Sequence, residues 1–133
     1  MPLVRRREGF TLIELLTVMM IVGLLAAIAL NRFWAVKDRA FKAAIKSDLR
    51  IMAVQQERYF EKNMQYATDP AQLPDFSPTT GVVITVTWTA NNGWAATAIH
   101  QSRPAEPCGY FMGPAPAGVA TPATLEGQIA CDE

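Results

Sequence analysis

Apolar and polar residues are distributed very unevenly along this chain of 133 residues. Residues 10–30, FTLIELLTVMMIVGLLAAIAL, include one charged residue, Glu14, and no proline. A helix of this length extends over about 31 Å, which matches the hydrocarbon core of a bilayer. The pattern therefore predicts a membrane-spanning helix over residues 10–30.

A second pattern, over residues 31–62, predicts an amphipathic helix that continues the first. This segment has neither proline nor glycine, and its apolar residues recur at helical spacings on one face: Trp34, Phe41, Ile45, Leu49, Met52 and Tyr59. The charged residues between them, Asp48 included, are expected on a solvated or subunit-facing surface. The joined helix, from about Thr11 to Lys62, would be about 80 Å long, and the 71 residues that follow are too few to cover it. Its first half must be covered by lipid or by copies of the same chain.

Residues 63–133 are expected to form a small antiparallel β-sheet head, which makes the fold class α+β. Residues 63–78 contain three prolines and predict a loop. Residues 82–89 alternate apolar and polar side chains and predict a strand, with residues 94–100 as a weaker partner.

The two strands are expected to form a hairpin, because Asn92 and Gly93 are typical of a two-residue type I′ turn. Pairing across that turn places Val86 opposite Ile99. It also brings four apolar side chains to the face that would pack on the helix: Ile84, Val86, Trp88 and Ile99.

The C-terminal part of the head contains both cysteines of the chain. Residues 108–112 and 128–131 are candidate third and fourth strands, and the stretch between them, residues 113–124, is rich in proline, alanine and glycine and predicts an exposed loop. Two cysteines in an exported domain predict a disulfide, Cys108–Cys131. A metal pair or a redox centre is the alternative, but the spacing supports neither.

Charge is strongly segregated although the chain has no net charge. Residues 1–9 sum to +2, residues 32–62 to +4 and residues 63–133 to −5. Such asymmetry fits nucleic-acid or membrane contact, or like subunits that pack head against stem. The acidic head disfavours nucleic acid, so we favour the packing of like subunits.

The sequence has no recognisable constellation of catalytic residues. The single histidine, His100, lies in an expected strand without a neighbouring cysteine, which favours a surface or hydrogen-bonded polar role. The serines lack the glycine-framed nucleophile turn of hydrolases, and no glycine-rich phosphate loop is present. We therefore expect no enzyme activity, no cofactor and no metal site.

Glu14 is the unusual residue, because a carboxylate inside an apolar span is costly. It either lies at headgroup depth or pairs with a cation from another chain or from a new amino terminus. The segment around it, residues 5–16 (RRREGFTLIELL), resembles the class III signal of type IV pilins and pseudopilins. In that family a short basic leader ends in glycine, which precedes a phenylalanine, and a glutamate stands at the fifth position after the cleavage site.

The resemblance implies a pilin fold and a defined processing route. A prepilin peptidase would cleave between Gly9 and Phe10 on the cytoplasmic side, which removes a leader of residues 1–9, and Phe10 would be N-methylated. Glu14 and the amine of Phe10 would then direct assembly into a homopolymeric helical filament. The C-terminal disulfide also resembles the disulfide-bounded region of type IVa pilins. Many members have proline where this chain has Asn31, so we expect a less interrupted helix here.

The resemblance also implies partners and location. The precursor would lie in the bacterial inner membrane with its N-terminus in the cytoplasm, and the pilus assembly machinery there would move it into an extracellular pilus. A subunit for twitching motility or adhesion fits. The alternatives are a type II secretion pseudopilin, a minor pilin, a DNA-uptake pilin, a single-span protein that never polymerises, and ordinary signal-peptide cleavage near residues 26–29.

Overall fold

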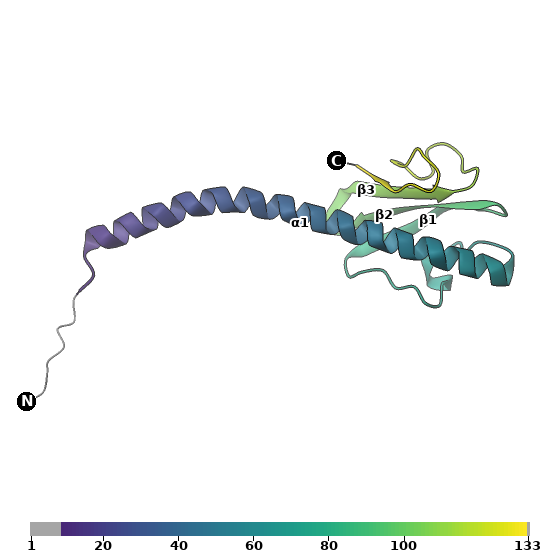
Figure 1. The fold of residues 1–133 in the computed structure, drawn as a ribbon, viewed down its shortest axis with the longest axis horizontal. Helices are drawn as coiled ribbons and strands as arrows, with labels where there is room; N and C mark the ends of the chain where they lie inside the picture. The colour runs from purple at the N-terminus through teal and green to yellow at the C-terminus, as the bar shows by residue number, and fades with distance from the viewer. Residues whose placement is uncertain (1–8, 133) are drawn as a thin grey trace, which may run out of the picture. The chain divides into compact units, whose positions relative to one another are not determined.

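The computed structural model describes residues 9–132 and divides the chain into two compact units, residues 1–38 and 39–133. The predicted basic leader, apart from Gly9, lies outside the described residues. One long helix, α1, comprises Leu12–Asn63 (Figure 1). It agrees with the predicted span of Thr11 to Lys62 within one residue at each end and is continuous through Asn31. It is also long and apolar enough to cross a membrane.

The second unit contains the head, a four-stranded sheet with the order β1-β2-β3-β4 (Figure 1). Its strands are β1 (Val82–Ala90), β2 (Gly93–His100), β3 (Arg103–Met112) and β4 (Ala130–Cys131), and each neighbouring pair is antiparallel. A short 3₁₀ helix, η1 (Pro70–Gln72), interrupts the predicted loop before β1. The α+β fold class is thus confirmed.

The core of the head forms where the second half of α1 packs on the sheet. Ile45, Leu49 and Met52 are almost completely buried, as the helical spacing predicts. Trp34, which the same spacing placed on this face, belongs to the first unit and is 54% exposed. From the sheet, the core receives Trp94, Ala96 and Ala98 of β2 together with residues of β1 and β3.

The predicted hairpin register is wrong. The turn consists of Asn91 and Asn92, and Gly93 is already the first residue of β2, paired with Ala90. No asparagine among the described residues has a positive φ, so the turn is not of type I′. The glycine at position 93 is required by a close approach instead, because a Cβ there would lie 2.3 Å from the carbonyl oxygen of Met112.

The register difference moves side chains to the other face of the sheet. Val86 pairs with Ala96, three residues away from the predicted partner Ile99. Successive side chains of a strand point to opposite faces, so a shift of three residues along β2 brings its other set of side chains to the core face. An irregularity between Val86 and Trp88 also turns Trp88 away from the core face. Ile84 and Val86 do pack on the core, whereas Ile99 and Trp88 are not part of that cluster.

Two polar side chains of α1 are buried, and neither was expected. Asp48 was expected on a solvated or subunit-facing surface, but it is 3% exposed and accepts hydrogen bonds from the backbone nitrogen and the hydroxyl of Thr79, at 2.7 and 2.9 Å. Gln56 is fully buried; its amide donates to the carbonyl of Ala67 (2.9 Å) and accepts from the Ala67 nitrogen (2.8 Å). These contacts fix both ends of the loop between α1 and β1.

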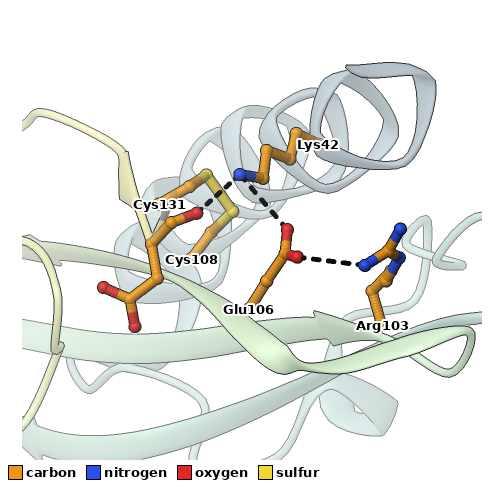
Figure 2. A network of polar contacts seen from close by, with 6 residues as sticks. Lys42, Arg103, Glu106, Cys108 and Cys131 are labelled. Atoms are coloured by element: carbon orange, nitrogen blue, oxygen red, sulfur yellow. Dashed lines mark hydrogen bonds and ion pairs between the residues drawn. A yellow bond between two sulfur atoms is a disulfide. The ribbon is translucent and has the colours of Figure 1, made fainter. Parts of the chain in front are cut away.

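The end of the chain is attached to the head at several points. Cys108 and Cys131 form the predicted disulfide and are also partners in the β3–β4 ladder. Figure 2 shows Lys42 of α1 next to this bond: its ammonium forms an ion pair with Glu106 (3.2 Å) and donates to the carbonyl of Asp132 (2.6 Å). Glu106 also contacts Arg103 at 3.4 Å. On the chain-entropy model, a disulfide that closes a loop of this size contributes about 3 kcal/mol.

The proline-rich loop, residues 113–124, is less exposed than predicted. Ala120 is only 2% exposed, and a Cβ at Gly109 would lie 1.7 Å from the Ala120 carbonyl oxygen. The hydroxyl of Thr87 also donates to the carbonyl of Val119. The loop therefore packs against strands β1 and β3, which the composition alone did not indicate.

Replacing Gln56 by alanine should loosen the loop between α1 and β1. Gln56→Ala removes both hydrogen bonds and leaves the N–H and C=O of Ala67 buried without a partner, at a cost of about 2 kcal/mol. The measurement is amide hydrogen exchange of the full chain in detergent, where Ala67 should lose protection. Gln55→Ala is the matched control, because Gln55 is only partly buried and makes no such bonds; equal loss of protection in both variants would contradict the interpretation.

Candidate functional site at the start of the long helix

The first turn of α1 contains a reciprocal hydrogen-bond arrangement. The backbone nitrogen of Thr11 donates to the carboxylate of Glu14 at 2.9 Å, and the Thr11 hydroxyl donates to the same oxygen at 2.7 Å. The backbone nitrogen of Glu14 in turn donates to the Thr11 hydroxyl oxygen at 3.3 Å. This is a capping box, with threonine at the N-cap and glutamate three residues later.

The capping box satisfies two backbone N–H groups that have no partner within the helix. The Glu14 carboxylate also lies where the partial positive charge of the helix dipole is concentrated. Glu14 is thus stabilised inside its own chain without a cation. The pattern T-x-x-E at residues 11–14 is the sequence signature of a capping box and could have predicted these hydrogen bonds. The interpretation of the sequence rested on the charge of Glu14 alone.

Gly9 and Phe10, the predicted cleavage pair, directly precede this turn. Both are exposed, and Phe10 has 75% of its surface accessible. Nothing lies within 4 Å of the position that a Cβ would occupy at Gly9. The structure therefore places Gly9, Phe10 and Glu14 within one short accessible segment.

The apolar side chains that follow are exposed rather than packed in a core. From Leu12 to Val36 the large apolar residues are between 45% and 77% exposed. The most apolar part of the helix has none of its residues buried. A surface of this size and continuity marks contact with a membrane or with another protein.

The remaining predicted residues lie in the second unit. Cys108 and Cys131 are joined there, and His100 has the polar role expected of it: its ring stacks on Phe41 and its Nδ1 accepts from the backbone nitrogen of Ser102 at 3.1 Å. Within residues 9–132, no group of three His, Cys, Asp or Glu side chains is arranged to hold a metal ion.

Comparisons with known proteins agree with this site. The family described as the prokaryotic N-terminal methylation motif matches residues 4–30. The chain is 37% identical over 76 residues to the type IV major pilin protein PilA of Myxococcus xanthus, which covers 57% of this chain and 34% of that protein. The chain thus contains the N-terminal methylation motif and is similar, over about half of its length, to a type IV major pilin.

Two further relatives come from different assemblies. The chain is 36% identical over 69 residues to the type IV wide pilus major component PilA4 of Thermus thermophilus, with 52% of this chain and 53% of that protein covered. It is 34% identical over 64 residues to the type II secretion system core protein G of Dickeya chrysanthemi, with 48% and 42% covered. The chain thus spans between 34% and 53% of the length of these relatives.

Removing the threonine hydroxyl should weaken the first turn of α1 specifically. Thr11→Val keeps the shape of the side chain but eliminates its two hydrogen bonds, and loss of an N-cap costs about 1 kcal/mol. Amide exchange of Glu14 and Leu15, whose N–H groups donate to Thr11, should become about fivefold faster in detergent. Thr17→Val is the control, since the Thr17 hydroxyl only donates to the carbonyl of Glu14 within the helix; an equal effect there would argue against the capping box.

Proposed function

We propose that this chain is a structural subunit of a type IV pilus. It is processed by prepilin peptidase after Gly9, N-methylated at Phe10, and polymerised through its N-terminal helix. The observation that carries the proposal is the first turn of α1, where the accessible Gly9–Phe10 bond and Glu14 stand directly before an exposed apolar helix surface. The role is structural, without catalysis.

Cleavage would create the cation that Glu14 needs in a polymer. A free α-amine at Phe10 is mostly protonated at neutral pH. A carboxylate and an ammonium attract strongly in a low-dielectric environment, so pairing between two chains would set the axial register of one subunit on the next. Glu14 would exchange its bonds to Thr11 for this charge pair and is therefore an assembly residue.

The apolar half of α1 would have two environments in succession. As a precursor the chain lies in the inner membrane with its N-terminus in the cytoplasm, and lipid covers residues 10–30. In the extracellular pilus, helices of neighbouring copies cover the same surface. The assembly machinery of the inner membrane moves the subunit from one environment to the other.

A pseudopilin of type II secretion or a minor pilin is the second candidate. The similarity to a type II secretion core protein supports it, because it involves about as much of this chain as the pilus relatives do. The disulfide and the small head favour the pilus subunit. The two candidates differ in abundance and location, because a major pilin forms long filaments outside the cell.

The N-terminus of the chain in sheared surface material tests the proposal. We expect abundant filaments whose subunit begins at N-methylated Phe10, determined by intact mass and fragmentation. Gly9→Val should leave the chain at precursor size, because a branched side chain replaces the hydrogen atom at the cleavage position. A processed chain confined to the membrane would favour the pseudopilin or minor pilin, and a mature product from Gly9→Val would refute this cleavage site.

Two substitutions separate the charge of Glu14 from its hydrogen bonds. Glu14→Gln can still accept from Thr11, because glutamine also completes a capping box, whereas Glu14→Ala cannot. If the charge pair directs assembly, both variants should be processed at Gly9, and both should lose filaments by tenfold or more, as counted by electron microscopy. Normal filaments from Glu14→Gln would show that the charge is not needed.

A further inference from the structure

One groove of the head is lined by cations and by no carboxylate. It has a volume of about 420 Å³ and lies between α1, strand β3 and the segment before β4. Its lining residues are Lys46, Arg50, Ala53, Tyr110, Gly127, Gln128 and Ile129. The cavity is therefore suited to an anionic group.

The two cations of this groove have no partner within the described part of the chain. Neither Lys46 nor Arg50 forms an ion pair or a side-chain hydrogen bond there, in contrast to Lys42 one turn earlier. They lie four residues apart on α1, where like charges repel. An anion between them would remove this repulsion.

Tyr110 can donate a hydrogen bond to an anion in the groove, because burial, together with the charges of Glu57 and Glu126, raises the pKa of its hydroxyl. The two carboxylates accept hydrogen bonds elsewhere, Glu57 from the hydroxyl of Tyr66 (3.3 Å) and Glu126 from the backbone nitrogen of Gly113 (2.6 Å). They keep their negative charge, which Lys46 and Arg50 must outweigh to hold an anion.

A complementary segment exists on the opposite edge of the same head. The loop of residues 64–81 contains Asp69 and Asp75 and neither lysine nor arginine. Both aspartates are exposed, and the Asp75 carboxylate has no bonding partner within residues 9–132. Helix η1 of this loop contacts β1, whereas Tyr110 of the groove belongs to β3, and β2 lies between β1 and β3 in the sheet.

We propose that the groove at Lys46 and Arg50 binds the acidic loop of a second copy of the chain, with Asp75 between the two cations. The inference rests on the proposed function, since it assigns a contact between neighbouring subunits. The groove and the loop are different surfaces at opposite edges of the head, so the contact between two copies is heterologous. Successive copies can then add through the same contact without forming a closed ring. Such a contact suits an open filament.

Photo-cross-linking in assembled material tests this contact. A photoreactive amino acid replaces the exposed groove residue Gln128 in the full chain, and cross-linked dimers are mapped by mass spectrometry. We expect the link to fall on residues 69–75 of the partner copy. Arg50→Glu should reduce the yield about tenfold, and Arg50→Glu combined with Asp75→Arg should restore it, because the charges are exchanged.

Arg39→Glu is the matched control. Arg39 is exposed on the same helix and gives the same change of net charge, but it lines neither this groove nor the groove that contains Asp75. Equal loss in both variants, or an unchanged yield in Arg50→Glu, would overturn the proposal. Two further results would also overturn it. One is a cross-link from Gln128 to nucleic acid. The other is protection of Lys46 from chemical modification by inorganic phosphate, in filaments that lack the cross-link between copies.

The outcomes for this contact and for the pilus are separable. Filaments that begin at Phe10 but lack the link would leave the pilus subunit intact and refute the groove contact. The same link in a chain that remains in the membrane, without surface filaments, would support the contact and refute the pilus subunit.

Discussion

The long apolar surface of α1 is the constraint on which the rest of the structure depends. Burial of a single large apolar side chain is worth about 1.5–3 kcal/mol, and more than a dozen such side chains between Phe10 and Val36 remain exposed in the isolated chain. No rearrangement of a small head could cover them. The chain therefore needs a bilayer or another protein surface to cover them.

The second half of α1 has a different role, because its side chains hold two irregular segments, the loop before β1 and the C-terminal segment, against the head. Asp48 and Gln56 are buried in it yet have all their bonds to the loop before β1. Lys42 and the disulfide act similarly on the C-terminal segment (Figure 2). A few directional contacts thus replace the larger hydrophobic core that 95 residues of the second unit would otherwise require.

The periodicity of apolar residues predicted the helix and the strands well. The properties of single residues predicted the hairpin register and the buried polar contacts less well. The helix, the strands and the disulfide follow from spacing and composition. The hairpin register does not, since Gly93 is required by the approach of Met112 from β3, a contact that no local pattern encodes. Burial of Asp48 and Gln56 depends on backbone groups of a distant loop. At the candidate site, the motif singled out Gly9, Phe10 and Glu14, and the capping box of Thr11 was within reach of the sequence as the pattern T-x-x-E.

The capping box has a consequence for Glu14 in any environment that lacks water. Because the backbone nitrogen and the hydroxyl of Thr11 both donate to the Glu14 carboxylate, that carboxylate keeps two hydrogen bonds even where no cation reaches it. In the proposed filament, the free energy gained by a charge pair between two chains would therefore be only the difference between two hydrogen-bonded states of Glu14. A contact of that kind would hold neighbouring subunits in register and still be reversible.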